Sequence, residues 1–263
     1  MTMAERVERA RALVERAGAP ATLHRATEDL FPDVDGLPEV PLSELTVDGL
    51  ASGIQHHGGM VVRGLLAPDQ VEALRAQLQD GTLRAKQGGA SSSEVDRMVA
   101  MLIDAYRAQG VLDLAERYLG EAPVGFPHRT VVKRNEPSAG LPWHQDASFF
   151  RGPCGSLDVW TALTECGRKC PSLWLVPRRI ERILDESQTT VDASATVEDE
   201  MPEVLEGVEA VRPVLQPGDA ILLDEMTVHR TGTGWKIPSR EVAVTWFFAP
   251  SRLPAMTARP IAF

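Results

Sequence analysis

The segment Pro142-Trp143-His144-Gln145-Asp146 places a histidine and a carboxylate two residues apart. The residues around it are typical of a strand, in which residues i and i+2 point to the same face. We therefore expect His144 and Asp146 to reach one metal ion from one side. One further histidine would complete a two-histidine, one-carboxylate face, the arrangement typical of non-haem Fe(II) oxygenases.

A third ligand and a cation both follow farther along the chain. His229 alone of the six histidines comes after His144, behind a strand-like run at residues 220–228 that begins at a Pro-Gly-Asp turn. Arg240 follows at the start of the last long strand-like run. A buried guanidinium needs an anionic partner and binds a carboxylate through two hydrogen bonds. If pairing between neighbouring strands brings Arg240 beside the metal, the distal carboxylate of 2-oxoglutarate would fill that role.

Each of these residues also has an ordinary structural interpretation. An isolated His-x-Asp triplet is common by chance, and a single late histidine such as His229 is more often a satisfied core or surface residue. Arg240, which follows a Pro-Ser pair, could be a solvated charge. The joint arrangement is far more specific than any one of its parts, so it favours a metal site.

The composition excludes several classes of function. The 263 residues are 43% hydrophobic, enough for a full core, and the formal net charge is -10 with a pI of about 5.1. An acidic balance argues against nucleic acid and anionic membrane surfaces as partners, because basic patches supply that affinity. The N-terminus lacks the apolar core of a signal peptide, and no apolar run is long enough for a membrane span. We therefore expect a soluble, cytoplasmic protein with three free cysteine thiols.

The first half of the sequence predicts helices around one strand. Residues 4–17 have the pattern of an amphipathic helix, and residues 19–50 are rich in Pro, Asp and Gly and are expected to be irregular. A short strand is predicted at 59–64, followed by a helix that opens at Pro68. Residues 80–92 are small and polar and are expected to form a loop before a helix over 95–106.

The second half has short strand-like runs at residues 130–133, 157–163, 172–176, 220–223 and 241–248. Turn residues separate them, as in a sandwich or jelly roll. We predict one domain over residues 1–263, mainly β with flanking helices on a double-stranded β-helix (jelly-roll, cupin-like) core. Residues 1–55 would be a helical and irregular extension, and the acidic stretch 184–209 an insertion that could act as a lid.

These residues together resemble the phytanoyl-CoA dioxygenase family of Fe(II)- and 2-oxoglutarate-dependent oxygenases, over about residues 55–250. The resemblance runs from the strand and helix start at 58–69 through Trp143-His144-Gln145-Asp146 and Val159-Trp160-Thr161 to His229-Arg230-Thr231 and Arg240. The His-Gln-Asp triplet and the spacing from the distal histidine to the arginine are its specific parts.

The resemblance implies a role for each matched position. His144, Asp146 and His229 would be the iron ligands, and no further catalytic residue is expected beyond them. Arg240 would bind the distal carboxylate of 2-oxoglutarate, with Thr231 beside the same carboxylate. Trp160 and Thr130 would line the co-substrate pocket, although they could equally be an ordinary core tryptophan and strand threonine.

The chain departs from the family pattern on both sides of the strand that contains Leu173. The family usually has an Asn-Gly pair before this strand and Pro-Gly-Ser-His after it. Here those stretches read Lys169-Cys170-Pro171-Ser172 and Pro177-Arg178-Arg179-Ile180. The second stretch normally forms a turn near the pocket rim, so the change bears on the substrate more than on iron binding.

The expected reaction follows from the resemblance: Fe(II), 2-oxoglutarate and O2 would oxidise a small metabolite or natural-product intermediate with release of succinate and CO2. Related halogenases replace the carboxylate ligand with a small residue, so Asp146 favours hydroxylation, while desaturation, ring formation and epimerisation stay open. Two alternatives are a cupin-like isomerase or hydrolase that does not use 2-oxoglutarate, and a non-catalytic barrel that binds a small molecule. The sequence does not indicate an oligomeric state.

Overall fold

Short runs of β-branched and aromatic residues form most of the strands, as their composition predicts. The computed structural model describes residues 1–79, 92–127, 130–135, 141–150, 152–168, 170–186, 196–231, 240–254 and 259–263. The helices are α1 (Met3–Arg16), α2 (Val47–His57), α3 (Pro68–Gln79), α4 (Ser92–Ala108), α5 (Val111–Leu119), α6 (Asp146–Phe150) and α7 (Met201–Val204), with short 3-10 helices η1 (Leu42–Glu44), η3 (Glu198–Glu200) and η4 (Pro250–Arg252). The strands are β1 (Glu39–Pro41), β2 (Met60–Arg63), β3 (Val124–Gly125), β4 (Thr130–Asn135), β5 (Leu141–His144), β6 (Ser156–Ala162), β7 (Leu173–Leu175), β8 (Ala220–Leu223), β9 (His229–Thr231), β10 (Arg240–Phe248) and β11 (Ile261–Ala262).

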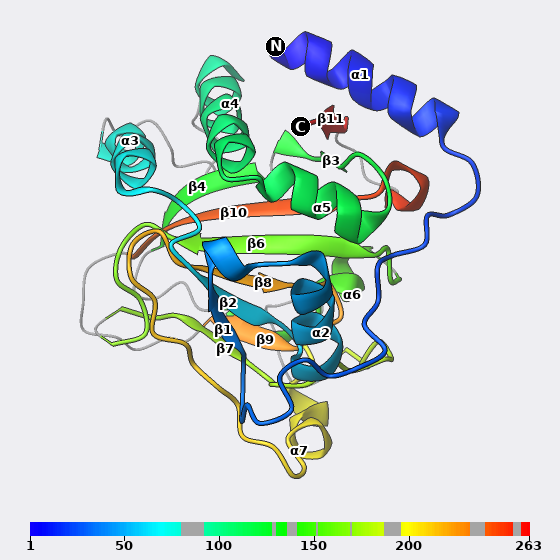
Figure 1. The fold of residues 1–263 in the computed structure, drawn as a ribbon, viewed down its shortest axis with the longest axis vertical. Coiled ribbons are helices and arrows are strands. Elements are labelled where there is room, and N and C mark those ends of the chain that lie inside the picture. The colour runs from blue at the N-terminus through cyan, green and yellow to red at the C-terminus, as the bar shows by residue number, and fades with distance from the viewer. Residues whose placement is uncertain are drawn as a thin grey trace.

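The larger of two sheets is organised around β10. Within the described residues it has eight strands in the order β1-β2-β8-β6-β10-β3-β11, with β4 also paired to β10 (Figure 1). β10 pairs antiparallel with β6 along one edge and with β4 and β3 along the other. All nine residues of β10 are buried, so both faces of this strand must be covered by other elements.

Helices α2 to α5 cover the outer face of the larger sheet (Figure 1). Side chains alternate along a strand, so Ala243 and Phe247 of β10 point toward these helices. The ring of Tyr106 on α4 meets Phe247 edge to face, with ring centroids 5.9 Å apart. This apolar layer is the main core of the protein and holds the sheet on the side away from the site.

The second sheet is smaller and consists of β5, β9 and β7 in that order. A second apolar cluster contains Leu173 and Leu175 of β7 together with Ile221, Val244 and Trp160 of the larger sheet. The two sheets therefore face each other across a shared interior. This arrangement is the double-stranded β-helix that the sequence predicts, with helices on one outer face.

The segment after residue 196 covers the outer face of the smaller sheet. Val197, Met201 and Val204 pack with Trp143 of β5 in a third cluster. Arg178 donates hydrogen bonds to the main-chain carbonyls of Glu203, Val204 and Glu206 at the end of α7. Part of the expected insertion thus packs as a fixed outer layer, while residues 187–195 lie outside the described residues.

The first half of the chain differs from expectation in one region. Helices α1 and α3 and strand β2 are confirmed. Residues 19–50, expected to be irregular, contain β1, η1 and the start of α2. β1 is a three-residue edge strand that pairs parallel with β2, and α2 packs against β2 and β8. The loop expected at 80–92 lies almost wholly outside the described residues, since α4 begins at Ser92.

None of the described helices is both long and apolar enough to cross a membrane.

Candidate metal centre

His144 and Asp146 lie on different elements, so the expectation that both belong to one strand is wrong. His144 is the last residue of β5, and Asp146 is the first residue of α6. The chain turns at Gln145 between them. The two side chains nevertheless approach each other, with His144 Nε2 and Asp146 Oδ1 3.6 Å apart. This separation is too long for a hydrogen bond between the two atoms and leaves room for a shared ligand.

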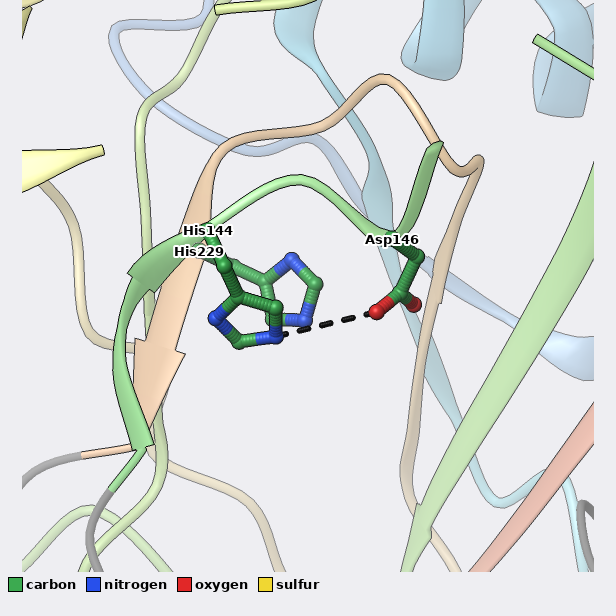
Figure 2. Close-up of side chains that lie close together, drawn as sticks. All are labelled: His144, Asp146 and His229. Atoms are coloured by element: carbon green, nitrogen blue, oxygen red, sulfur yellow. Dashed lines mark ion pairs between the residues drawn. The ribbon is translucent and has the colours of Figure 1, made fainter. Parts of the chain in front are cut away.

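His229 reaches the same point because β9 pairs with β5. In that antiparallel pair His144 is directly opposite His229, and their ring centroids are 4.2 Å apart. Figure 2 shows the two rings side by side on neighbouring strands with the Asp146 carboxylate facing them. One candidate ligand atom from each of the three residues lies within 4.8 Å of the others. His229 was expected at the end of the preceding strand, but it begins a strand of its own, after the turn that follows β8.

The hydrogen bonds of the two imidazoles determine which nitrogen faces the site. His144 Nδ1 lies 2.7 Å from the carbonyl oxygen of Pro142, and His229 Nδ1 lies 3.0 Å from that of Thr227. A carbonyl oxygen only accepts, so each Nδ1 must carry the proton. Each Nε2 then presents a lone pair, the form in which histidine binds a metal ion.

The chemistry of this donor set suits a divalent metal. The three side chains are each no more than 6% exposed, and the carboxylate of Asp146 brings one negative charge into this buried space. An uncompensated buried charge is costly, and a cation would offset it. Two neutral imidazole nitrogens and one carboxylate oxygen on one face match the ligand set of non-haem Fe(II). These residues would hold the ion and leave its opposite face open.

Gln145 fixes the turn between the two predicted ligands, a role that sequence reasoning missed. Its buried amide nitrogen donates to the carbonyl oxygens of Met226 and Arg182, at 2.8 and 3.2 Å. Its amide oxygen accepts from the main-chain N–H of Leu184 at 2.9 Å. The side chain thus ties the His144–Asp146 turn to the segment that leads to His229. Only its position between the two ligands could have suggested this role.

Glu225 connects the same elements from the other side and was also missed. Its carboxylate accepts from the main-chain N–H groups of Gly155 and Ser156 and from the Ser156 hydroxyl, at 2.6–2.9 Å. Its carbonyl oxygen accepts from the N–H of Ala147, next to Asp146. The hydrogen-bonding capacity of the buried carboxylate is filled by Ser156 of β6 and by Gly155 just before it, so Glu225 has a structural role.

Arg240 and Thr231 contact each other across the interior, while their expected role at the distal carboxylate stays a prediction. Arg240 Nη2 donates to Thr231 Oγ1 at 3.3 Å, and Nη1 donates to the carbonyl oxygen of Pro171 at 3.0 Å. The expected route is wrong: β9 and β10 belong to different sheets, and the long side chain bridges them. Arg240 is 2% exposed, and this burial lowers its pKa to about 10. An anionic ligand would stabilise its charge.

The remaining predicted pocket residues have different outcomes. The guanidinium carbon of Arg240 lies 5.2 Å from the ring centroid of Trp160, a cation–π contact, and the pocket role of Trp160 stays a prediction. Thr130 begins β4 and pairs with Thr245, but its side chain lies outside the described residues. Phe149 of α6 packs against His144, with centroids 5.6 Å apart.

Comparison with known proteins identifies the family. The family model for phytanoyl-CoA dioxygenase matches residues 54–234, which is more than half of the chain. This range includes the three clustered residues and Thr231 and ends before Arg240. No curated protein matches the sequence.

Solved structures with a similar fold share little sequence with this chain. EctD from S. alaskensis, solved with 2-oxoglutarate and 5-hydroxyectoine, has a TM-score of 0.58 at 17% identity and covers 91% of this chain and 87% of its own. EvdO2 from Micromonospora carbonacea var. aurantiaca, in complex with 2-oxoglutarate, has a TM-score of 0.56 at 20% identity, covering 79% and 91%. The epimerase SnoN, in complex with Fe3+, alpha-ketoglutarate and nogalamycin RO, has a TM-score of 0.56 at 19% identity, covering 77% and 83%.

These likenesses show the fold, and the family match over most of the chain shows its descent. The protein belongs to the phytanoyl-CoA dioxygenase family of iron- and 2-oxoglutarate-dependent oxygenases.

Proposed function

We propose that this protein hydroxylates a small metabolite at an iron centre held by His144, Asp146 and His229, with 2-oxoglutarate as co-substrate. The observation that carries the proposal is the meeting of these three buried side chains with both imidazole Nδ1 atoms hydrogen-bonded to carbonyls. Iron, when bound there with 2-oxoglutarate, supplies the activation of O2 that no side chain provides. The three solved structures named with 2-oxoglutarate, called alpha-ketoglutarate in SnoN, support the choice of co-substrate.

Arg240 supports the co-substrate assignment by its distance from the metal centre. Thr231, which accepts from Arg240, lies two residues beyond His229 along β9, or about 7 Å at the usual strand rise. Thr231 and His229 are on the same face of the strand. The span is comparable to the length of an extended five-carbon dicarboxylate. One end of 2-oxoglutarate would reach the metal while the distal carboxylate pairs with the guanidinium.

The charges of such a complex balance. Asp146 contributes one negative charge, Arg240 one positive charge, and a divalent metal would cancel the two charges of the dicarboxylate. Both residues are nearly fully buried, so a neutral sum matters for stability. Without 2-oxoglutarate in this position, the burial of Arg240 would serve no evident catalytic purpose.

Aromatic side chains on α6 form an apolar wall beside the metal centre. Phe149 packs on His144, and Phe150 meets Trp246 and Phe248 edge to face with centroids 5.1 and 5.3 Å apart. Exclusion of water protects a reactive site from side reactions. An apolar wall of this kind suits a substrate that presents a C–H bond to the iron.

The test uses isotopically labelled O2. The protein loaded with Fe(II) is incubated with 2-oxoglutarate and a panel of small metabolites, and products are analysed by mass spectrometry. We expect one labelled oxygen atom in succinate and one in the hydroxylated product. Labelled succinate must be lost in His144→Ala. A product formed without O2 consumption would refute the proposal and favour an isomerase or hydrolase.

A further inference from the structure

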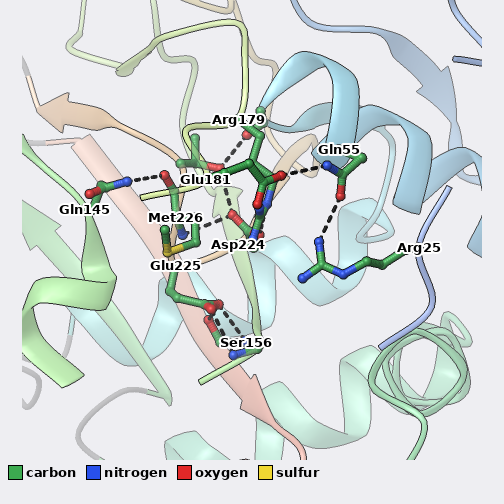
Figure 3. Close-up of polar contacts among 12 residues, drawn as sticks. Arg25, Gln55, Gln145, Ser156, Arg179, Glu181, Asp224, Glu225 and Met226 are labelled. Carbon is green, nitrogen blue, oxygen red and sulfur yellow. Dashed lines mark hydrogen bonds and ion pairs between the residues drawn. The ribbon is translucent and has the colours of Figure 1, made fainter. Parts of the chain in front are cut away.

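The segment Pro177-Arg178-Arg179-Ile180, where the chain departs from its family, places a buried arginine behind the metal centre. The Arg179 side chain is only 5% exposed. Its Nε donates to Asp224 Oδ2 at 2.7 Å, and its Nη1 pairs with Glu181. Figure 3 shows the guanidinium between these two carboxylates.

Asp224 organises the turn that leads from β8 to His229. Its Oδ1 accepts from the main-chain N–H of Met226 at 3.0 Å. Thr227 donates its hydroxyl to the carbonyl oxygen of Gly58 at 2.6 Å. The carbonyl oxygen of the same Thr227 accepts from His229 Nδ1. The position of the imidazole therefore depends on the turn, and the turn is built around the Asp224 carboxylate.

The carboxylate of Asp224 needs a cation to stay in place. It is 4% exposed and is followed by Glu225, which is 2% exposed, so two acidic residues are buried next to each other. Burial, with repulsion from Glu225, raises the pKa of Asp224 to about 6, while Arg179 opposes this shift. Glu225 has its own donors in Gly155 and Ser156, whereas the described ion pair of Asp224 is with Arg179. Loss of Arg179 would leave a buried charge unpaired.

We propose that Arg179 is a positioning residue for the iron site: its ion pair with Asp224 fixes the 224–228 turn so that His229 Nε2 meets His144 and Asp146. The inference rests on the proposed function, because it takes His229 as an iron ligand. Partners that orient a ligand from behind influence metal affinity by about 10- to 100-fold when they are removed. Arg179 would therefore control iron affinity without touching iron or substrate.

The experiment compares equilibrium iron binding by the full-length protein and its variants under anaerobic conditions. Arg179→Met keeps the apolar stem and removes the charge, and we expect the iron Kd to rise about 10- to 100-fold. Arg179→Lys keeps the charge but loses the planar fork, so it should restore part of the affinity. Thermal melting of the apo-proteins is measured in parallel. Iron binding is then measured at a temperature at which every variant is folded.

Arg182→Met is the matched control. Arg182 lies on the same segment and pairs with Glu200 and Glu203, but its side chain is 49% exposed, and among the described contacts no hydrogen bond or ion pair joins that side chain to the turn. Its iron Kd should stay within about twofold of wild type, because an exposed ion pair contributes little. Cobalt(II) provides a second readout, since its visible spectrum reports loss of a histidine ligand in Arg179→Met but not in Arg182→Met.

The outcomes separate this inference from the proposed function. A wild-type protein that binds no iron would refute the proposed function itself. A wild type that binds iron, with Arg179→Met equally tight and only its melting temperature lowered, would show a purely structural role and overturn the inference. If Arg179→Met does not fold, Arg179→Lys decides: we expect weaker iron binding than in wild type, and unchanged affinity would refute the positioning role.

Discussion

Arg240 Nη2 lies 3.3 Å from Thr231 Oγ1 although the two residues belong to strands of different sheets. This hydrogen bond crosses the interior between the sheets, and Thr231 shares its strand with His229. The contact therefore holds the buried guanidinium near the metal centre, at a distance set by the two-residue spacing of His229 and Thr231 on β9. The two side chains meet although their strands are not paired.

Removal of the Arg240 guanidinium should weaken co-substrate binding selectively. For Arg240→Leu we expect the KM for 2-oxoglutarate to rise at least about tenfold, since hydrogen bonds to charged groups contribute about 1.5–3 kcal/mol. Arg240→Lys should fall between this variant and wild type, because it keeps the charge without the two-pronged geometry. The measurement is succinate formation at increasing 2-oxoglutarate concentrations.

Arg75→Leu is a suitable control for that experiment. Arg75 pairs with Glu241, the residue after Arg240, at 2.6 Å on the opposite face of β10. Its loss removes a guanidinium that pairs with the same strand but leaves the interior unchanged. An unaltered KM for 2-oxoglutarate in Arg240→Leu, or an equal increase in Arg75→Leu, would rule out the carboxylate-binding role.

Gly58 should be far less tolerant of substitution than Gly64. Both have a positive φ, +71° and +66°, at which a side chain costs about 1–2 kcal/mol. A Cβ at Gly58 would also lie 2.8 Å from the carbonyl oxygens of Val176 and Arg178, whereas nothing lies within 4 Å of one at Gly64. We expect Gly58→Ala to destabilise the fold by about 2–5 kcal/mol and Gly64→Ala by about 1–2 kcal/mol. Denaturant unfolding gives both changes in the free energy of unfolding. Equal changes would show that the close approach at Gly58 does not affect stability.

The two tyrosines should resist ionisation until the protein unfolds. Burial raises the pKa of Tyr106 to about 12 and that of Tyr118 well above its usual value. A native state with a raised tyrosine pKa binds more protons than the unfolded state, so stability is retained below about pH 10 and falls as the pH rises toward 12. For Tyr106 the loss is about 1.4 kcal/mol per pH unit across that window.

The ultraviolet absorbance of tyrosinate, recorded with far-UV circular dichroism, tests this expectation. Both tyrosines should ionise together with the loss of helix signal. Tyr106→Phe provides the control, because one tyrosine then remains and should behave in the same way. Ionisation of either ring near pH 10 in the folded protein would contradict the burial argument.

Much of the fold was predictable because its strands have strong local signals. The runs that became β6 and β10 are rich in β-branched and aromatic residues, and the apolar run that became β8 follows a Pro-Gly-Asp turn. Helix α2 was missed because it contains Gly49 and Gly53, which lower helix propensity. Gly53 is needed for close packing, since a Cβ there would lie 3.0 Å from the Cβ of Met60. Tertiary contact outweighed local preference.

The candidate site was predictable only in its outline. Residue type and order along the chain marked His144, Asp146 and His229, even though Asp146 belongs to a helix of five residues that is too short for a periodic pattern. The ties made by Gln145 and Glu225 left no local signal. Their partners are 37–81 residues away in the sequence, so only the folded chain reveals them.

The central claim is that His144, Asp146 and His229 hold iron in a form that binds 2-oxoglutarate. Anaerobic titration of the protein with Fe(II) and then 2-oxoglutarate tests it directly, without knowledge of the substrate. We predict a visible metal-to-ligand charge-transfer band that saturates at one iron and one 2-oxoglutarate per chain and is lost in Asp146→Ala and His229→Ala. Absence of the band in folded wild-type protein, or its persistence at full strength in both variants, would contradict the account.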